Sequence, residues 1–99
     1  MTQAPIRLGS VVRSRAGRDR DRFFVVVGIV DERYVLIADG DLRKLASPKK
    51  KKLLHLKVTP ACMSEIQSRL ESGEQLQDAQ IRRCLASSGY GPVSYTHLR

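Results

Sequence analysis

The stretch that decides the fold is Phe23-Phe24-Val25-Val26-Val27-Gly28-Ile29-Val30, followed after a short turn by Tyr34-Val35-Leu36-Ile37-Ala38. β-branched and aromatic residues dominate both segments, and both are shorter than most helices, so each is predicted to be a β-strand. Gly28 interrupts the more apolar strand and predicts a bulge or a sharp bend there. The two segments are therefore expected to pair as neighbouring strands.

Three further short strands are predicted on either side of this pair. One covers residues 8–15, and two more cover residues 42–45 and 53–58. The segment between the last two, residues 47–52, is predicted to be a loop by its composition. Five short strands joined by tight turns within about 55 residues predict a small closed barrel.

The pattern changes at Thr59, where helices are expected to begin. Thr59 followed by Pro60 predicts a helix start, because a hydroxyl can cap free amides and proline fits the first helical position. An apolar stripe at a spacing of four residues continues this helix: Cys62, Ile66 and Leu70. Gly73 is expected to end it, and a second helix is predicted from Asp78 to about Ser87. Isolated helices this short are marginal in water, so the pair is expected to pack as a hairpin on the barrel or on a partner.

The predicted fold is thus mostly β with a helical appendage, of the α+β class. The barrel covers residues 7–58, the helical hairpin residues 59–88, and a tail residues 89–99. No apolar stretch reaches the roughly 18 residues that a membrane span needs, and the N-terminus lacks the apolar core of a secretory signal. We therefore expect a cytoplasmic, monomeric protein with no membrane partner, and Cys62 and Cys84 are expected to be reduced.

Charge is distributed very unevenly along the chain. The formal net charge is +8, from 18 Lys and Arg against 10 Asp and Glu. Residues 1–57 hold 14 basic and 6 acidic side chains, whereas residues 58–99 hold 4 of each. All of the excess lies in the first half, which is typical of a module that binds a polyanion.

Two clusters of basic residues are the candidates for contact with the phosphates of such a polyanion. The first surrounds Gly17 and consists of Arg13, Arg15, Arg18, Arg20 and Arg22. The planar guanidinium group suits phosphate, and a tight loop can project several such groups at once. The second cluster consists of Arg43, Lys44, Lys49, Lys50, Lys51 and Lys52, expected on one edge of the barrel. Neutralisation by Asp19 and Asp21 is the alternative for the arginines, and plain solvation is the alternative for the lysines.

The inventory of side chains also limits the function. Aromatic residues are few, and Phe23 and Phe24 are expected in the core, so binding should depend on phosphates and shape, with low sequence specificity. The chain has no glycine-rich phosphate loop, no HExxH and no GxSxG motif, and no cluster of cysteine and histidine. We therefore expect no enzymatic activity, no cofactor, no metal and no small-molecule substrate.

Four segments carry a resemblance to a known family: Leu8-Gly9-Ser10-Val11-Val12, Ala16-Gly17-Arg18-Asp19, the Phe23–Val30 strand, and Val35-Leu36-Ile37-Ala38-Asp39-Gly40. They resemble the KOW motif of ribosomal and transcription-associated proteins. The likeness is to bacterial KOW domain-containing RNA-binding proteins, which are similar to a large-subunit ribosomal protein family of eukaryotes and archaea. The resemblance implies a Src-homology-3-like barrel that binds ribosomal or other RNA, with the ribosome as a partner. The alternative is a protein-interaction module in which the helix pair docks a ribosomal or transcription protein.

Within the resemblance, Gly17 matches the signature glycine of the KOW motif. A second glycine is usual in the family a few residues later, where this chain has Asp21. Aspartate tolerates a left-handed backbone better than most residues, so the loop is expected to survive this change. Separately, residues 92–98 resemble a reading-frame translation of a common transposase sequencing adapter, and residues 92–99 are therefore expected not to be native. The alternative is a genuine flexible tail, which would also have no function.

Overall fold

Five strands and two α-helices make up the computed structural model of this chain, which describes residues 6–15, 17 and 20–90. The expected tail beyond residue 90 lies outside this range. The strands are β1 (Ser10–Ser14), β2 (Phe23–Ile29), β3 (Tyr34–Ala38), β4 (Lys49–Lys52) and β5 (Leu56–Cys62). A 3-10 turn, η1 (Leu53–His55), precedes β5, and the helices are α1 (Ser64–Ser72) and α2 (Asp78–Ser87). The predicted α+β class is confirmed.

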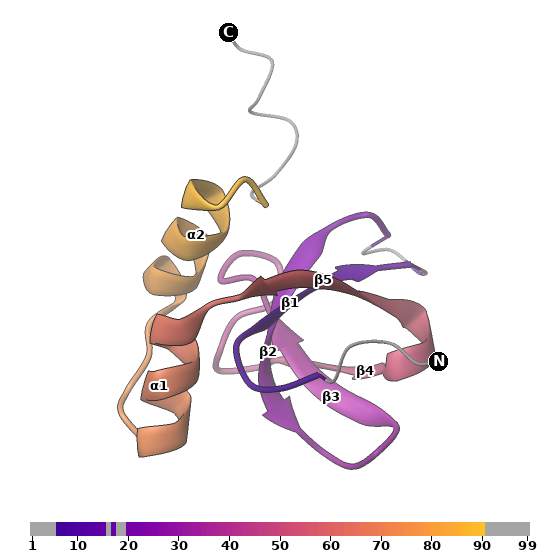
Figure 1. Cartoon of the computed structure of the whole chain (residues 1–99), viewed down its shortest axis with the longest axis horizontal. Coiled ribbons are helices and arrows are strands. Elements are labelled where there is room, and N and C mark those ends of the chain that lie inside the picture. The colour runs from indigo at the N-terminus through magenta and orange to yellow at the C-terminus, as the bar shows by residue number, and fades with distance from the viewer. Residues whose placement is uncertain (1–5, 16, 18–19, 91–99) are drawn as a thin grey trace, which may run out of the picture.

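The strands form one antiparallel sheet in the order β4-β3-β2-β1-β5. β4 and β5 are its edges, so the ring of strands that the sequence predicted is not closed by hydrogen bonding between the strands described. β4 is short, with only four residues, and every one of them pairs with β3. Figure 1 shows η1 linking the two edge strands at one end of the curved sheet.

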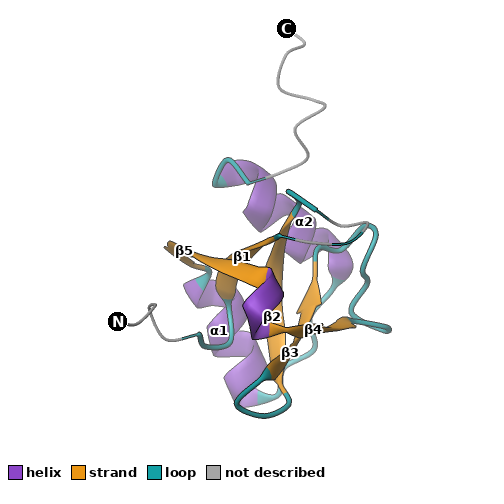
Figure 2. Ribbon diagram, turned by 90° about the vertical axis from the view of Figure 1, so that its right-hand side faces the viewer, coloured by secondary structure: helices purple, strands orange, loops and turns teal. Residues whose placement is uncertain are grey.

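Both faces of the sheet bury apolar side chains, because successive residues on a strand point to opposite faces. One face buries Val12, Phe24, Val26, Val35, Ile37 and Leu56. The other face packs against the helices and buries Val11, Val25, Ala38, Ile66, Ile81 and Leu85. Full burial of each large apolar side chain contributes roughly 1.5–3 kcal/mol. The two helices lie behind the sheet in Figure 2, and the buried apolar residues of both pack against it.

The bulge predicted at Gly28 is confirmed. Val26 pairs with Ile37 and Gly28 pairs with Leu36, so β2 advances two residues where β3 advances one. A Cβ atom on Gly28 would lie 3.0 Å from a methyl carbon of Leu36, which explains the absence of a side chain there. The extra residue, Val27, packs against the helix-side core.

Two expectations for the segment after β3 are wrong. Residues 42–45 form a turn and not a strand, because Oδ1 of Asp39 accepts the amides of Asp41 and Arg43, each at 2.9 Å. The lysine run, predicted as a loop, forms β4 instead. Pairing with β3 supplies the hydrogen bonds that override the weak strand propensity of lysine.

The start of the helical region also differs from the prediction. Thr59 and Pro60 lie in β5, and the predicted strand over residues 53–58 becomes η1 followed by β5. β5 bulges at this point, and the Thr59 hydroxyl donates a 2.8 Å hydrogen bond to the carbonyl of Val11. Proline, which has no amide hydrogen, fits a bulge in an edge strand.

The observed bounds of the two helices are closer to the predicted ones. α1 begins only at Ser64, but it ends at Gly73, as predicted, with φ at 80°. α2 spans the predicted residues Asp78–Ser87. In the part of the chain described, neither helix is long and apolar enough to cross a membrane.

Candidate nucleic-acid interface

The loop between β1 and β2 carries the first predicted cluster and is tightly closed. Ser14 faces two residues, because the Asp21 amide donates to its carbonyl at 2.8 Å and its own amide donates to the Arg22 carbonyl at 3.0 Å. This is the hydrogen-bond pattern of a bulge whose first residue is left-handed and usually glycine. Asp21 occupies that position with φ at 69°, as its tolerance of this conformation predicted. Arg20 is exposed beside it, and its amide donates to the Gly17 carbonyl at 3.2 Å.

Gly17 brings the two predicted clusters together. A Cβ atom built on Gly17 would lie 3.5 Å from the Nζ of Lys51. The arginine-rich loop and the lysine run, far apart in the sequence, are therefore neighbours in space. Gly17 has φ at 81°, which favours glycine at this close approach. Arg18, also predicted to contact RNA, lies outside the described residues.

The lysine strand, β4, presents its side chains alternately to the two faces of the sheet. Lys49 and Lys51 are half-buried on the face of the sheet that also buries Phe24. Lys50 and Lys52 lie on the other face, with their Nζ atoms 4.7 and 5.9 Å from the ring centre of Tyr34. Lysines on an edge strand also protect it from pairing with another chain, which is the structural alternative to a binding role.

A second basic site lies on β1 and β5, and the sequence revealed only part of it. Arg13 stands directly opposite Lys57 in the register of these strands. Beyond the pair Ser14–Leu56 lie Arg15 and His55, joined by a 2.8 Å hydrogen bond from the arginine amide to the histidine carbonyl. Lys57 and His55 were not predicted as contacts. Their alternation with Leu56 and Val58 was visible in the sequence, but their pairing with β1 was not.

Arg22, by contrast, is engaged within the protein. Its guanidinium lies 3.4 Å from the carboxylate of Asp39 and 3.8 Å from that of Asp41. Asp39 is only 5% exposed, and its carboxylate also orders the following turn. We therefore assign Arg22 a structural role and leave it out of the interface.

Arg43 and Lys44 lie on the turn after β3, and the contacts that fix this turn run to α2. The Leu45 amide donates to the Asp78 carboxylate at 2.8 Å, and the guanidinium of Arg82 donates to the Gly40 carbonyl. The helical region thus holds a predicted basic segment in place.

The two cysteines are Cys62, at the end of β5, and Cys84, on α2. Both are free and half-buried. Burial and the nearby Glu65 carboxylate raise the pKa of the Cys84 thiol, and Arg83 opposes this shift. Among the described residues, no group of three or more His, Cys, Asp or Glu side chains could hold a metal ion.

The chain matches no protein-family model and no curated protein.

Proposed function

We propose that this protein binds structured RNA through phosphate contacts, as a KOW-type module with a Src-homology-3-like arrangement of strands. The basic surface consists of the Gly17 loop and the lysine strand, and the pair Arg13–Lys57 on β1 and β5 is a second basic site. The observation that carries the proposal is the position of Gly17 against Lys51, because it joins separate basic segments into one surface. Ribosomal RNA is the target that the family resemblance suggests.

Electrostatics supports a polyanionic ligand. Cations held close together on a surface repel one another and destabilise the folded state by themselves. A phosphate backbone removes this repulsion, since each contact releases counterions from the nucleic acid. About five phosphate contacts imply a slope of roughly −3 to −4.5 in a plot of log affinity against log salt concentration.

The aromatic side chains support recognition of folded RNA over single strands. Phe24 is fully buried, and Phe23 stacks on Tyr90 with ring centres 4.8 Å apart. Tyr34 is half-buried, and the ammonium groups of Lys50 and Lys52 lie over its ring. Single-strand binders usually offer several exposed aromatic rings to successive bases. Contacts to phosphates and shape are therefore the better match to this surface.

Docking of a ribosomal or transcription protein by the helix pair has less support. Ile66, Ile81 and Leu85 supply the apolar stripe of the helices, and all three are buried against the sheet. These three side chains are used within the chain, so they are not available to a partner.

The test replaces Lys49, Lys50, Lys51 and Lys52 together by glutamine and measures binding of a fluorescent RNA hairpin. We expect affinity to fall more than tenfold, because at least two phosphate contacts are lost. The matched control is Arg83→Gln, which removes one exposed charge from α2, and it should change affinity less than twofold. If the lysine variant binds RNA normally but self-associates, the lysines serve only to protect the edge strand and the proposal is wrong.

A further inference from the structure

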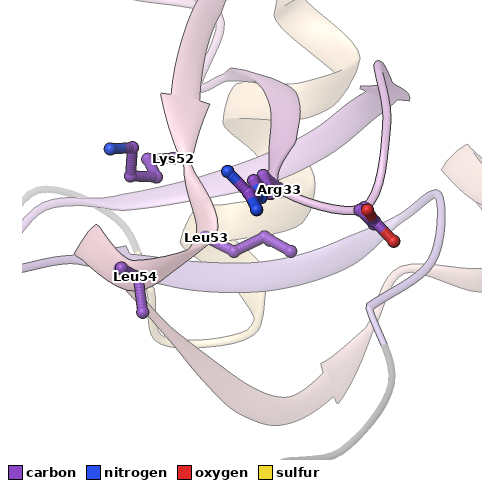
Figure 3. Close-up of a pocket in the computed structure, with 5 residues that line it drawn as sticks. Arg33, Lys52, Leu53 and Leu54 are labelled. Carbon is purple, nitrogen blue, oxygen red and sulfur yellow. The ribbon is translucent and has the colours of Figure 1, made fainter.

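A pocket of about 320 Å³ lies where the lysine strand ends. Glu32, Arg33, Lys52, Leu53 and Leu54 line it, and Figure 3 shows Leu53 next to Arg33, with Lys52 and Leu54 beside them. Its residues come from the β2–β3 turn, the end of β4 and η1. Lys52 belongs both to this pocket and to the basic surface, so the two are continuous.

Hydrogen bonds hold the walls of the pocket in place. The Asp31 carboxylate accepts the amides of Arg33 at 2.7 Å and Tyr34 at 2.9 Å, which fixes the turn that carries Arg33. The Leu53 amide donates to the Arg33 carbonyl at 2.8 Å and ties this turn to η1. The backbone segments that carry Arg33 and Leu53 are therefore fixed relative to each other.

The lining of the pocket combines two leucines, two cations and one carboxylate. Leu54 is 76% exposed, although a leucine gains free energy when its surface is removed from water. Beside it lie the cations Arg33 and Lys52, and the Glu32 carboxylate repels an anion from its own side. The volume is at the lower end of the range for small-ligand pockets. An apolar surface next to two cations matches a flat ring joined to a phosphate.

We propose that this pocket takes one unpaired nucleotide of the bound RNA. The base lies against Leu53 and Leu54, and its phosphate lies at Arg33 and Lys52. This inference rests on the proposed function and adds local selectivity to it. A bulged or looped nucleotide is favoured over a continuous duplex, because only an unpaired base can leave the stack and enter the pocket.

The test compares two RNA hairpins that differ by one bulged nucleotide, with 2-aminopurine at the bulge as a fluorescent reporter. The unmodified protein should bind the bulged hairpin about fivefold more tightly, and the reporter signal should change on binding. Leu54→Ser should abolish this preference while changing affinity for the paired hairpin less than twofold. Leu42→Ser, at a leucine that is 55% exposed outside the pocket, is the matched control and should keep the preference.

The outcomes separate the two proposals. Equal binding of both hairpins by the unmodified protein, or a preference that survives in Leu54→Ser, overturns the pocket assignment and leaves phosphate binding intact. Failure of the unmodified protein to bind either hairpin overturns the proposed function together with the pocket.

Discussion

Arg13 on β1 stands directly opposite Lys57 on β5, so two cations face each other across neighbouring antiparallel strands. Side chains in such a pair have Cβ atoms about 4.5–5.5 Å apart, and like charges there destabilise a sheet. The Nε of Arg13 is also buried without a hydrogen-bond partner in the part of the chain described. Both features oppose stability and are consistent with a surface arranged for an anion.

Lys57→Glu should therefore change stability and RNA binding in opposite directions. An opposite-charge pair with Arg13 should raise the free energy of unfolding by roughly 0.2–1 kcal/mol, measured by urea denaturation. RNA affinity should fall severalfold, because a repulsive carboxylate replaces a phosphate contact. Arg83→Glu, with the same charge change on α2, should affect binding much less. A Lys57→Glu variant with unchanged RNA affinity would exclude this pair from the interface.

Arg22 and Arg20 should behave differently although both were predicted as RNA contacts. Arg22→Gln removes the partner of the buried Asp39 carboxylate and should lower the free energy of unfolding by roughly 1 kcal/mol. Arg20→Gln, at an exposed position of the same loop, should leave stability within about 0.5 kcal/mol and reduce RNA affinity. Thermal unfolding and RNA titration of both variants check this; the reverse pattern would place Arg22 in the interface.

The backbone of Asp21 makes a separate prediction about the loop. Asp21→Gly and Asp21→Val remove the same negative charge, so differences between them report on conformation. At φ of 69° valine should cost about 1–2 kcal/mol of stability, whereas glycine should be tolerated. Equal stability of the two variants, measured by chemical denaturation, would show that this residue is not left-handed.

A comparison of Gly40 with Gly73 separates two effects of an added side chain on stability: a collision with neighbouring atoms and backbone strain. Both have φ at 80°, but a Cβ on Gly40 would collide with the Asp78 carbonyl, whereas one on Gly73 meets nothing within 4 Å. Gly73→Ala should cost about 1 kcal/mol through the backbone alone. Gly40→Ala should cost at least about 1 kcal/mol more, since α2 must move away from the turn. Similar midpoints for both variants in urea would contradict the docking of α2 on this turn.

Much of the local structure could be predicted from the sequence, because it depends on the conformational preferences of single residues. The β-branched runs specified β2 and β3, Gly28 specified the bulge between them, and Asp21 specified a left-handed loop residue. Gly73 likewise fixed the end of α1. The uneven distribution of charge along the chain could also be predicted, since it follows directly from the order of the residues.

Tertiary structure decided what depends on partners far apart in the chain. Lys49–Lys52 became a strand because β3 supplies hydrogen bonds that composition cannot reveal, and Thr59 entered β5 because its hydroxyl reaches the Val11 carbonyl. Strand register is likewise non-local, so the opposition of Arg13 and Lys57 required the fold. The sequence by itself thus determined which residues are basic and where β2, β3 and α2 lie. Only the pairing of distant strands decided which cations share a surface, because it depends on the free energy of the whole sheet.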